Sequence, residues 1–371
     1  RSPDSLGFLP HPNQHEALQS HWEATFGRLS EIPVFPDSED AEYQGWVSYS
    51  KPYKYVSSEE RDLMPDEKYA QYAVDVINGE HSKPFLLAVG FTSTHTPYYA
   101  PDNYFDRFPL EDLERATFLT DDLKDCANIL AQEEGTSNTD YGFRRYNNVM
   151  AAGGEDLLLE WTQAYLACAA LVDDQIGKIL NAIQKSPHAN NTIIIVTSDH
   201  GFHMGEKEFL FKNSVWHESL NIPLIFAGPG IANGDVEQPV SLIDVYPTLI
   251  DLCNLPENPN TETNQVPLDG FSLVPFLKNP GFTDWDGPDV SLSVIQGTEI
   301  TDMNDPSSVK KQHYVVHGSD YNYVYCNNGE EELYHTSEDP YEWFNLANDT
   351  GYVNEKQRMK NTLFELVPGL E

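Results

Sequence analysis

Polar side chains that can bind metals or anions follow two short apolar runs of this chain. Asp199 and His200 come directly after the β-branched run Thr192–Thr197, and His95 follows the run Phe85–Val89. An aspartate is a hard oxygen ligand suited to a divalent cation, and a neighbouring histidine can be a second ligand or donate to an anion. An isolated Asp-His pair is more often a turn cap beside a solvated imidazole, so the surrounding elements decide between the two interpretations.

The pattern around these residues predicts an α/β domain. Apolar residues recur every three or four positions over Glu155–Lys185, which predicts a long helix, and Ser241 begins a capping-box pattern that predicts a helix through Leu252. Buried strands are predicted at Phe85–Val89, Thr192–Thr197 and Pro223–Ala227. Strands that alternate with helices indicate a largely parallel central sheet flanked by helices. Ligands bind at the carboxyl ends of such strands, which is where Asp199 and His95 fall.

The texture of the sequence changes at both ends of this domain. A helix is predicted after Met64, with Pro65 in its first turn and an end at Asn78. After about residue 285, Tyr314–Val316 and Tyr321–Tyr325 predict an antiparallel hairpin. We therefore divide the chain into a main domain over residues 1–285 and a small C-terminal α+β subdomain with an antiparallel sheet over residues 286–371.

The composition restricts the partners of the chain. A formal net charge of −37 argues against nucleic acid and anionic membranes, because both attract cationic surfaces. No apolar run approaches the roughly 20 residues that cross a bilayer. We interpret the charge as a solubility device for salty surroundings, where screening weakens self-repulsion. An anionic substrate would then require a local cationic pocket or a metal.

Lys212 lies downstream of the Asp199–His200 pair, and its simplest interpretation is a surface lysine. In a chain with only 22 lysines and arginines, a lysine at this place is more informative than usual. The pair Arg144–Arg145 is consistent with two interpretations, a bidentate grip on a substrate carboxylate or a structural salt bridge. Four nearby polar residues are interpreted as turn hydrogen bonds or surface side chains: His203, Glu206, Lys207 and His217.

The four cysteines show no metal-type spacing and leave all three disulfide pairings open, although Cys168 falls on the apolar face of a helix and is expected to be a buried thiol. Sequons at Asn190 and Asn348 give weak support for a secretory origin and a glycoprotein. We expect a secreted, lysosomal or periplasmic location, and a true start upstream of Arg1.

The segment Ser198–Glu206 resembles the second metal-binding segment of type I sulfatases, which belong to the alkaline-phosphatase superfamily. From about Pro65 to Ala347, further segments fit the same family in order and spacing, and the arrangement looks closest to iduronate-2-sulfatase-like members. These segments are Lys83–Phe91, Thr94–Pro97, Phe211–Ser214, Ile222–Ile225, Asp244–Leu249, Asp269–Leu273, Glu332–Tyr334, Asp339–Pro340 and Asn345–Leu346.

The resemblance implies a sulfatase-like fold and the hydrolysis of a sulfate ester on a sulfated sugar. Asp199 would bind the metal, usually calcium, and His200 stands where the family places the neighbouring ligand. His95 would contact the sulfate and protonate the leaving oxygen. Lys212 would bind a sulfate oxygen and stabilise its developing charge.

The resemblance also implies parts that this sequence lacks. The family has paired aspartates after an N-terminal strand, and a Cys- or Ser-x-Pro-x-Arg segment whose first residue becomes formylglycine, the nucleophile. Neither occurs here, so we do not expect the chain alone to be active. Residues 1–285 would be the catalytic domain without its N-terminal segment. We rank a proteolytically separated segment docked as a second chain first, a segment missing from this sequence second, and a degenerate relative third.

Two other functions remain open. The first is a phosphatase or phosphodiesterase of the same superfamily, because the imidazole of His200 suits zinc or manganese better than calcium. The second is a non-catalytic, acidic secreted protein that binds or supports others on a sulfatase scaffold.

Overall fold

The computed structural model describes residues 26–31, 47–48, 51–52, 54–131, 140–256, 267–297, 302 and 305–370. The chain divides into two compact units. The first unit consists of residues 1–117 and 145–192, and the second of residues 118–144 and 193–371. The domain boundary predicted near residue 285 lies inside the second unit and stays a prediction.

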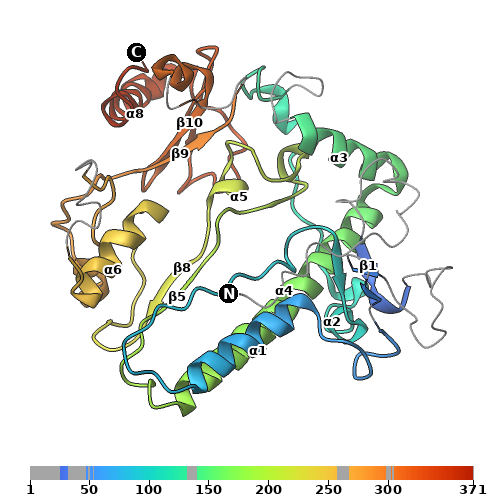
Figure 1. The fold of residues 1–371 in the computed structure, drawn as a ribbon. Coiled ribbons are helices and arrows are strands. Elements are labelled where there is room, and N and C mark those ends of the chain that lie inside the picture. The colour runs from blue at the N-terminus through green and yellow to red at the C-terminus, as the bar shows by residue number, and fades with distance from the viewer. Residues whose placement is uncertain are drawn as a thin grey trace. The chain divides into compact units, whose positions relative to one another are not determined.

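Two long helices form the centre of the first unit. Helix α1 (Pro65–Asn78) lies along α4 (Gly154–Lys185), and both match the predicted helices (Figure 1). Their contact is close because Ala70 and Ala73 of α1 are fully buried, while α4 contributes the buried Trp161. The smaller elements are β1 (Phe26–Arg28), β2 (Val47–Ser48), β3 (Lys51–Pro52), β4 (Tyr98–Ala100) and α2 (Asp102–Phe105). Helix α3 (Asp140–Ala152) contains the division between residues 144 and 145, so its residues belong to both units.

A buried ion pair fixes the start of α1. Arg61 donates to both carboxylate oxygens of Glu67, at 2.6 and 2.8 Å, and the two side chains are 9% and 6% exposed. Glu67 also accepts the backbone N–H of Met64 at 2.7 Å. This satisfies one of the N–H groups that a helix start leaves without a partner inside the helix.

The predicted strand Phe85–Val89 is wrong, because the structure has no strand over residues 84–92. Phe85 is 40% exposed and Leu86 is 83% exposed. A short apolar run becomes a strand only when a neighbouring strand accepts its backbone hydrogen bonds. Among the described residues no strand pairs with this run.

The second unit contains the other two predicted strands, β5 (Ile194–Thr197) and β8 (Leu224–Ala227). They pair with each other in antiparallel register, Ile194 opposite Ala227, so a parallel relation between them is wrong. The reason lies in the connection. Parallel neighbours require a crossover, usually a helix, whereas here the chain returns through a tight hairpin and one helical turn. These elements are β6 (His203–Met204), β7 (Leu210–Phe211) and α5 (His217–Leu220).

The C-terminal part of this unit is a four-stranded antiparallel sheet in the order β12-β11-β10-β9, which confirms the predicted hairpin and antiparallel subdomain. Helix α8 (Val353–Leu366) covers one face of this sheet (Figure 1). There Met359 belongs to the same buried cluster as Val316 and Tyr323. The opposite face, with Val315, packs against a cluster that includes Trp216. The strands are β9 (Ser291–Ile295), β10 (His313–His317), β11 (Tyr321–Tyr325) and β12 (Glu331–His335).

The remaining helices of the second unit are α6 (Val245–Cys253) and α7 (Val274–Lys278). The predicted capping box before α6 is confirmed, since the N–H of Ser241 donates to the Asp244 carboxylate at 2.8 Å. No helix among the described residues is long and apolar enough to span a membrane. All four cysteines are free thiols, and Cys168 is fully buried as predicted.

Gly201 is held against the backbone of α5, and this contact gives a first prediction. Its N–H donates to the carbonyl of Ser219 at 2.8 Å, and a Cβ at this position would lie 2.0 Å from the Glu218 carbonyl oxygen. We expect Gly201→Ala to lower the free energy of unfolding by about 1–3 kcal/mol, because backbone must move to admit the methyl group.

The matched control is Gly177→Ala on α4, where a Cβ meets nothing within 4 Å. Alanine there is expected to raise the free energy of unfolding by about 0.5–1 kcal/mol, because alanine is the better helix former. Urea unfolding of the two variants measures both. Equal effects would contradict the close approach at Gly201.

Candidate functional site

The predicted site residues fall in both units of the chain. Asp199, His200 and Lys212 belong to the second unit, and His95 belongs to the first. The geometry within each unit is described separately.

Asp199 and His200 lie in the turn directly after β5. The Oδ2 atom of Asp199 and the Nε2 atom of His200 are 3.6 Å apart, and the aspartate side chain is 85% exposed. His200 Nδ1 lies 2.7 Å from the Gly201 carbonyl oxygen, which can only accept, so the proton of the neutral ring is on Nδ1. Its Nε2 therefore carries a lone pair and lies beside a carboxylate. Metal-binding histidines are usually oriented in this way, with the other ring nitrogen donating to a carbonyl group.

This pair fits two neighbouring positions on a divalent cation. It does not form a complete site, because calcium requires six to eight oxygen ligands. In the described part of the chain, no three histidine, cysteine, aspartate or glutamate side chains gather closely enough to hold a metal. The role of Asp199 and His200 as metal ligands stays a prediction.

Lys212 lies in an unusual stretch of backbone. Its neighbours Phe211 and Asn213 have φ angles of 76° and 68°, and Lys207 and Glu208 have φ angles of 56° and 53°. Side chains other than glycine avoid this left-handed region at a cost of about 1–2 kcal/mol each. Such conformations persist only where the surrounding packing imposes them, and they gather at functional sites.

The ammonium group of Lys212 is available to an anion. The side chain is partly exposed, and no carboxylate of the described residues forms an ion pair with it. In a chain with 59 acidic residues and 22 basic ones, a lysine without such a partner is a local exception. It can supply the cationic contact that an anionic substrate requires.

His95 is oriented by its own backbone and by α1. Its Nδ1 lies 2.7 Å from the Thr96 carbonyl oxygen, which can only accept, so Nδ1 is the donor in this hydrogen bond. The preceding turn is fixed by the buried Asp66, which accepts the backbone N–H groups of Thr92 and Ser93 at 2.9 and 2.7 Å. The turn that precedes β4 and carries His95 is therefore fixed to α1 through its backbone.

Two nearby side chains are buried, His203 at 0% and Lys207 at 3% exposure, so the surface interpretation is wrong for both. The interpretation as a turn hydrogen bond is confirmed for His203, whose Nδ1 lies 3.2 Å from the Glu206 carbonyl oxygen. His203 Nε2 lies 2.6 Å from the Ser214 hydroxyl, and burial lowers its pKa to about 3, so the ring is neutral. The interpretation as turn hydrogen bonds is confirmed for Glu206, whose carboxylate accepts the Met204 N–H at 2.7 Å.

The arginine pair is split between two environments, because Arg144 is exposed and Arg145 is buried. Only Arg144 is placed to reach a solvated substrate, and the choice between substrate grip and salt bridge stays open. Sequence reasoning missed the buried acidic residues Asp122, Glu332 and Glu342. No sequence signal places them beside Lys207, because each lies 85 or more positions from that lysine.

Two family models match this chain. The model named Sulfatase matches residues 20–255, and the model named N-sulphoglucosamine sulphohydrolase, C-terminal, matches residues 205–368. A sulfatase from Formosa agariphila is 31% identical over 306 residues, which are 81% of this chain and 54% of that protein. The chain thus spans about half the length of this relative.

Solved structures share the fold. A 2-O GAG sulfatase aligns with a TM-score of 0.61 at 21% identity, covering 93% of this chain and 71% of the other. The structure of another protein, in complex with its substrate D-glucosamine-2-N,6-O-disulfate, aligns with a TM-score of 0.57 at 23% identity. The alignment covers 81% of this chain and 68% of that one. The alkaline-phosphatase-like α/β class predicted from the sequence is confirmed, and the chain belongs to the sulfatase family.

Proposed function

We propose that the protein to which this chain belongs hydrolyses sulfate esters, with a sulfated sugar as substrate. The observation that carries the proposal is the pair formed by Asp199 Oδ2 and His200 Nε2, 3.6 Å apart at the end of β5. The same unit presents Lys212 without a carboxylate partner among the described residues. A divalent-cation position and a lysine ammonium suit a sulfate group, which carries negative charge through the reaction.

Each side chain has a distinct role in this proposal. Asp199 and His200 hold a divalent cation, proposed to be calcium, which offsets the charge of the sulfate group when it is bound. Lys212 donates to a sulfate oxygen and stabilises the charge that grows there. His95 contacts the sulfate and passes a proton from Nε2 to the leaving oxygen.

We propose further that a sulfatase segment carrying the formylglycine nucleophile completes the site as a separate polypeptide. The incomplete set of metal ligands supports this, and so does the apolar run Phe85–Val89, which no described strand pairs. Such a run can accept an added strand through its backbone groups. The sequons support an extracytoplasmic location for the assembled enzyme.

The sugar substrate has its own support. The model that matches residues 205–368 is named for an enzyme acting on sulphoglucosamine, and one structural neighbour holds a disulfated glucosamine. The acidic surface limits non-specific binding of anionic polymers, so recognition of a sulfate group depends on the few cations of the site.

The site residues are tested by kinetics on the complete protein with an aryl sulfate. We expect Asp199→Asn to lower kcat/KM at least about 100-fold, because a carboxylate at the cation is lost, and Lys212→Met to lower kcat by about 100- to 1000-fold. Asp235→Asn, an exposed aspartate of the same unit, is the matched control and should leave both constants unchanged. Near-normal turnover in Asp199→Asn and Lys212→Met would show that the site lies elsewhere.

The partner segment is tested by intact-mass analysis and N-terminal sequencing of the purified native protein under denaturing conditions. We expect two polypeptides, one of which carries formylglycine in a Cys-x-Pro-x-Arg context. A single species without that residue would leave no nucleophile. It would favour the non-catalytic binding protein on a sulfatase scaffold.

A further inference from the structure

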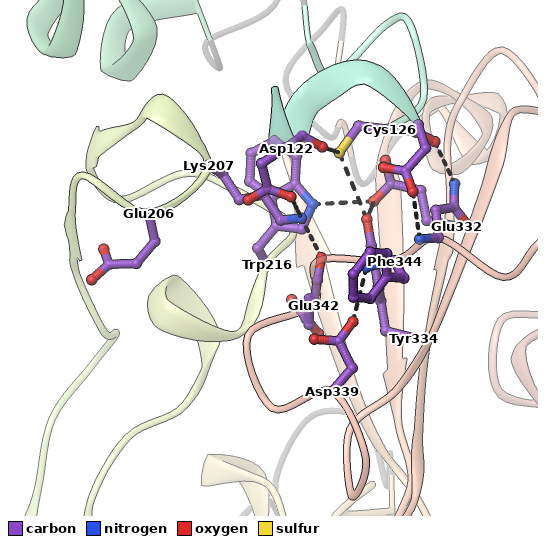
Figure 2. Close-up of polar contacts among 12 residues, drawn as sticks. Asp122, Cys126, Glu206, Lys207, Trp216, Glu332, Tyr334, Asp339, Glu342 and Phe344 are labelled. Carbon is purple, nitrogen blue, oxygen red and sulfur yellow. Dashed lines mark hydrogen bonds and ion pairs between the residues drawn. The ribbon is translucent and has the colours of Figure 1, made fainter. Parts of the chain in front are cut away.

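Lys207 is a buried cation in the same segment that carries Lys212. The Lys207 ammonium is 2.7 Å from Asp122 Oδ1, donates to the backbone carbonyl of Glu342, and stands 5.1 Å from the centre of the Tyr334 ring (Figure 2). Lys207 and Asp122 are 3% and 5% exposed. Lysine is almost never buried to this extent without a partner, so this arrangement is a specific feature of the fold.

Acidic groups outnumber this cation in its surroundings. Burial raises the pKa of Asp122, and it raises the pKa of Glu332 to about 7. Glu332 accepts hydrogen bonds from the Ala127 N–H at 2.6 Å and from the Trp216 indole at 3.1 Å. Burial acts to lower the pKa of Lys207, but the groups around it, Cys126 first and then Asp122 and Glu332, outweigh that effect and raise it. Lys207 is therefore charged wherever the protein is folded near neutral pH.

The segment that contains both Lys207 and Lys212 has a strained backbone, which tertiary contacts must hold in place. It begins at Gly205, whose φ is 122°, and ends at Asn213, with Lys207, Glu208 and Phe211 also at positive φ. Left to itself, such a backbone would relax toward ordinary φ angles and displace the side chain of Lys212. The buried Lys207 side chain opposes that movement from one side.

Glu342 makes hydrogen bonds to residues on both sides of Lys212. Its backbone carbonyl accepts from Lys207, and its carboxylate accepts the N–H of His217 at 2.9 Å and the amide of Asn322 at 2.7 Å. A single residue after β12 thus bonds to positions 207 and 217, with Lys212 midway between them. Glu342 is itself at a φ of 55° and is 2% exposed, so it is held as tightly as the segment it binds.

We propose that Lys207 is a positioning residue for Lys212, acting through its contacts with Asp122 and Glu342 to hold the strained segment in the conformation that presents the Lys212 ammonium to sulfate. The catalytic part of this inference rests on the proposed function. Lys207 touches no substrate in this account. A buried ion pair is weak evidence for stability, since apolar replacements are often as stable, but such a pair can fix one conformation among several.

The test replaces both members of the ion pair at once, in Lys207→Met/Asp122→Leu, so that neither of them is left buried as a charge without the other. We expect a melting temperature near that of the wild type, at least 10-fold faster hydrogen exchange at the amides of residues 207–217, and at least a 10-fold lower kcat on an aryl sulfate. Lys207→Arg, which keeps the charge, should recover part of the protection and part of kcat.

The matched control is Arg61→Met/Glu67→Leu, which removes the buried ion pair of the first unit. Exchange at residues 207–217 should stay at the wild-type rate in this variant, whatever happens to its melting temperature. Unchanged hydrogen exchange at residues 207–217 in Lys207→Met/Asp122→Leu would overturn the proposal. It would also be overturned if the loss of kcat in each double variant were accounted for by the fall in that variant's melting temperature.

Failure of the proposed function is read separately. If the wild-type protein turns over no sulfate ester, the sulfatase proposal fails, and the catalytic part of this inference fails with it. Hydrogen exchange still decides whether Lys207 holds the segment. Faster exchange confined to residues 207–217 supports the anchoring role, and unchanged exchange contradicts it.

Discussion

The second unit depends on one constraint, the placement of a single ammonium group inside an acidic protein. Lys207 connects three stretches of the chain. Lys207 itself follows β6, and its ammonium group contacts the carboxylate of Asp122 and the backbone carbonyl of Glu342, which follows β12. The buried cluster beside this ammonium group includes Trp216 and Tyr334, so the apolar core and the ionic contact reinforce each other. With the ends of the segment fixed in this way, its left-handed backbone is imposed by packing.

Much of the fold could be predicted because its determinants are local. The spacing of apolar residues in α4, and Pro65 followed by acidic residues in α1, specify helices without reference to the rest of the chain. The hairpin of β10 and β11 was equally readable from two aromatic-rich runs joined by a short turn. In each case the neighbours in sequence are also the neighbours in space.

The failures are of one kind, since they depend on distant partners. Phe85–Val89 has the composition of a strand, but no described strand pairs with it. β5 and β8 were predicted correctly as strands, yet their direction depends on how the intervening residues return. Lys207 was interpreted as a turn or surface residue because nothing near it in sequence indicates that Asp122 and Glu342 lie beside it. The proximity of the Asp199 and His200 side chains could be predicted because the two residues are adjacent in sequence, whereas their role as metal ligands stays a prediction.

The central claim is that Asp199 and His200 form part of a calcium site used on a sulfate ester. Metal analysis of the purified native protein tests it most directly, by measuring calcium and zinc per molecule after dialysis without chelator. The account predicts about one calcium per molecule, in line with one divalent-cation position that favours oxygen ligands. Zinc in place of calcium would contradict the account and favour a phosphatase or phosphodiesterase of the same superfamily.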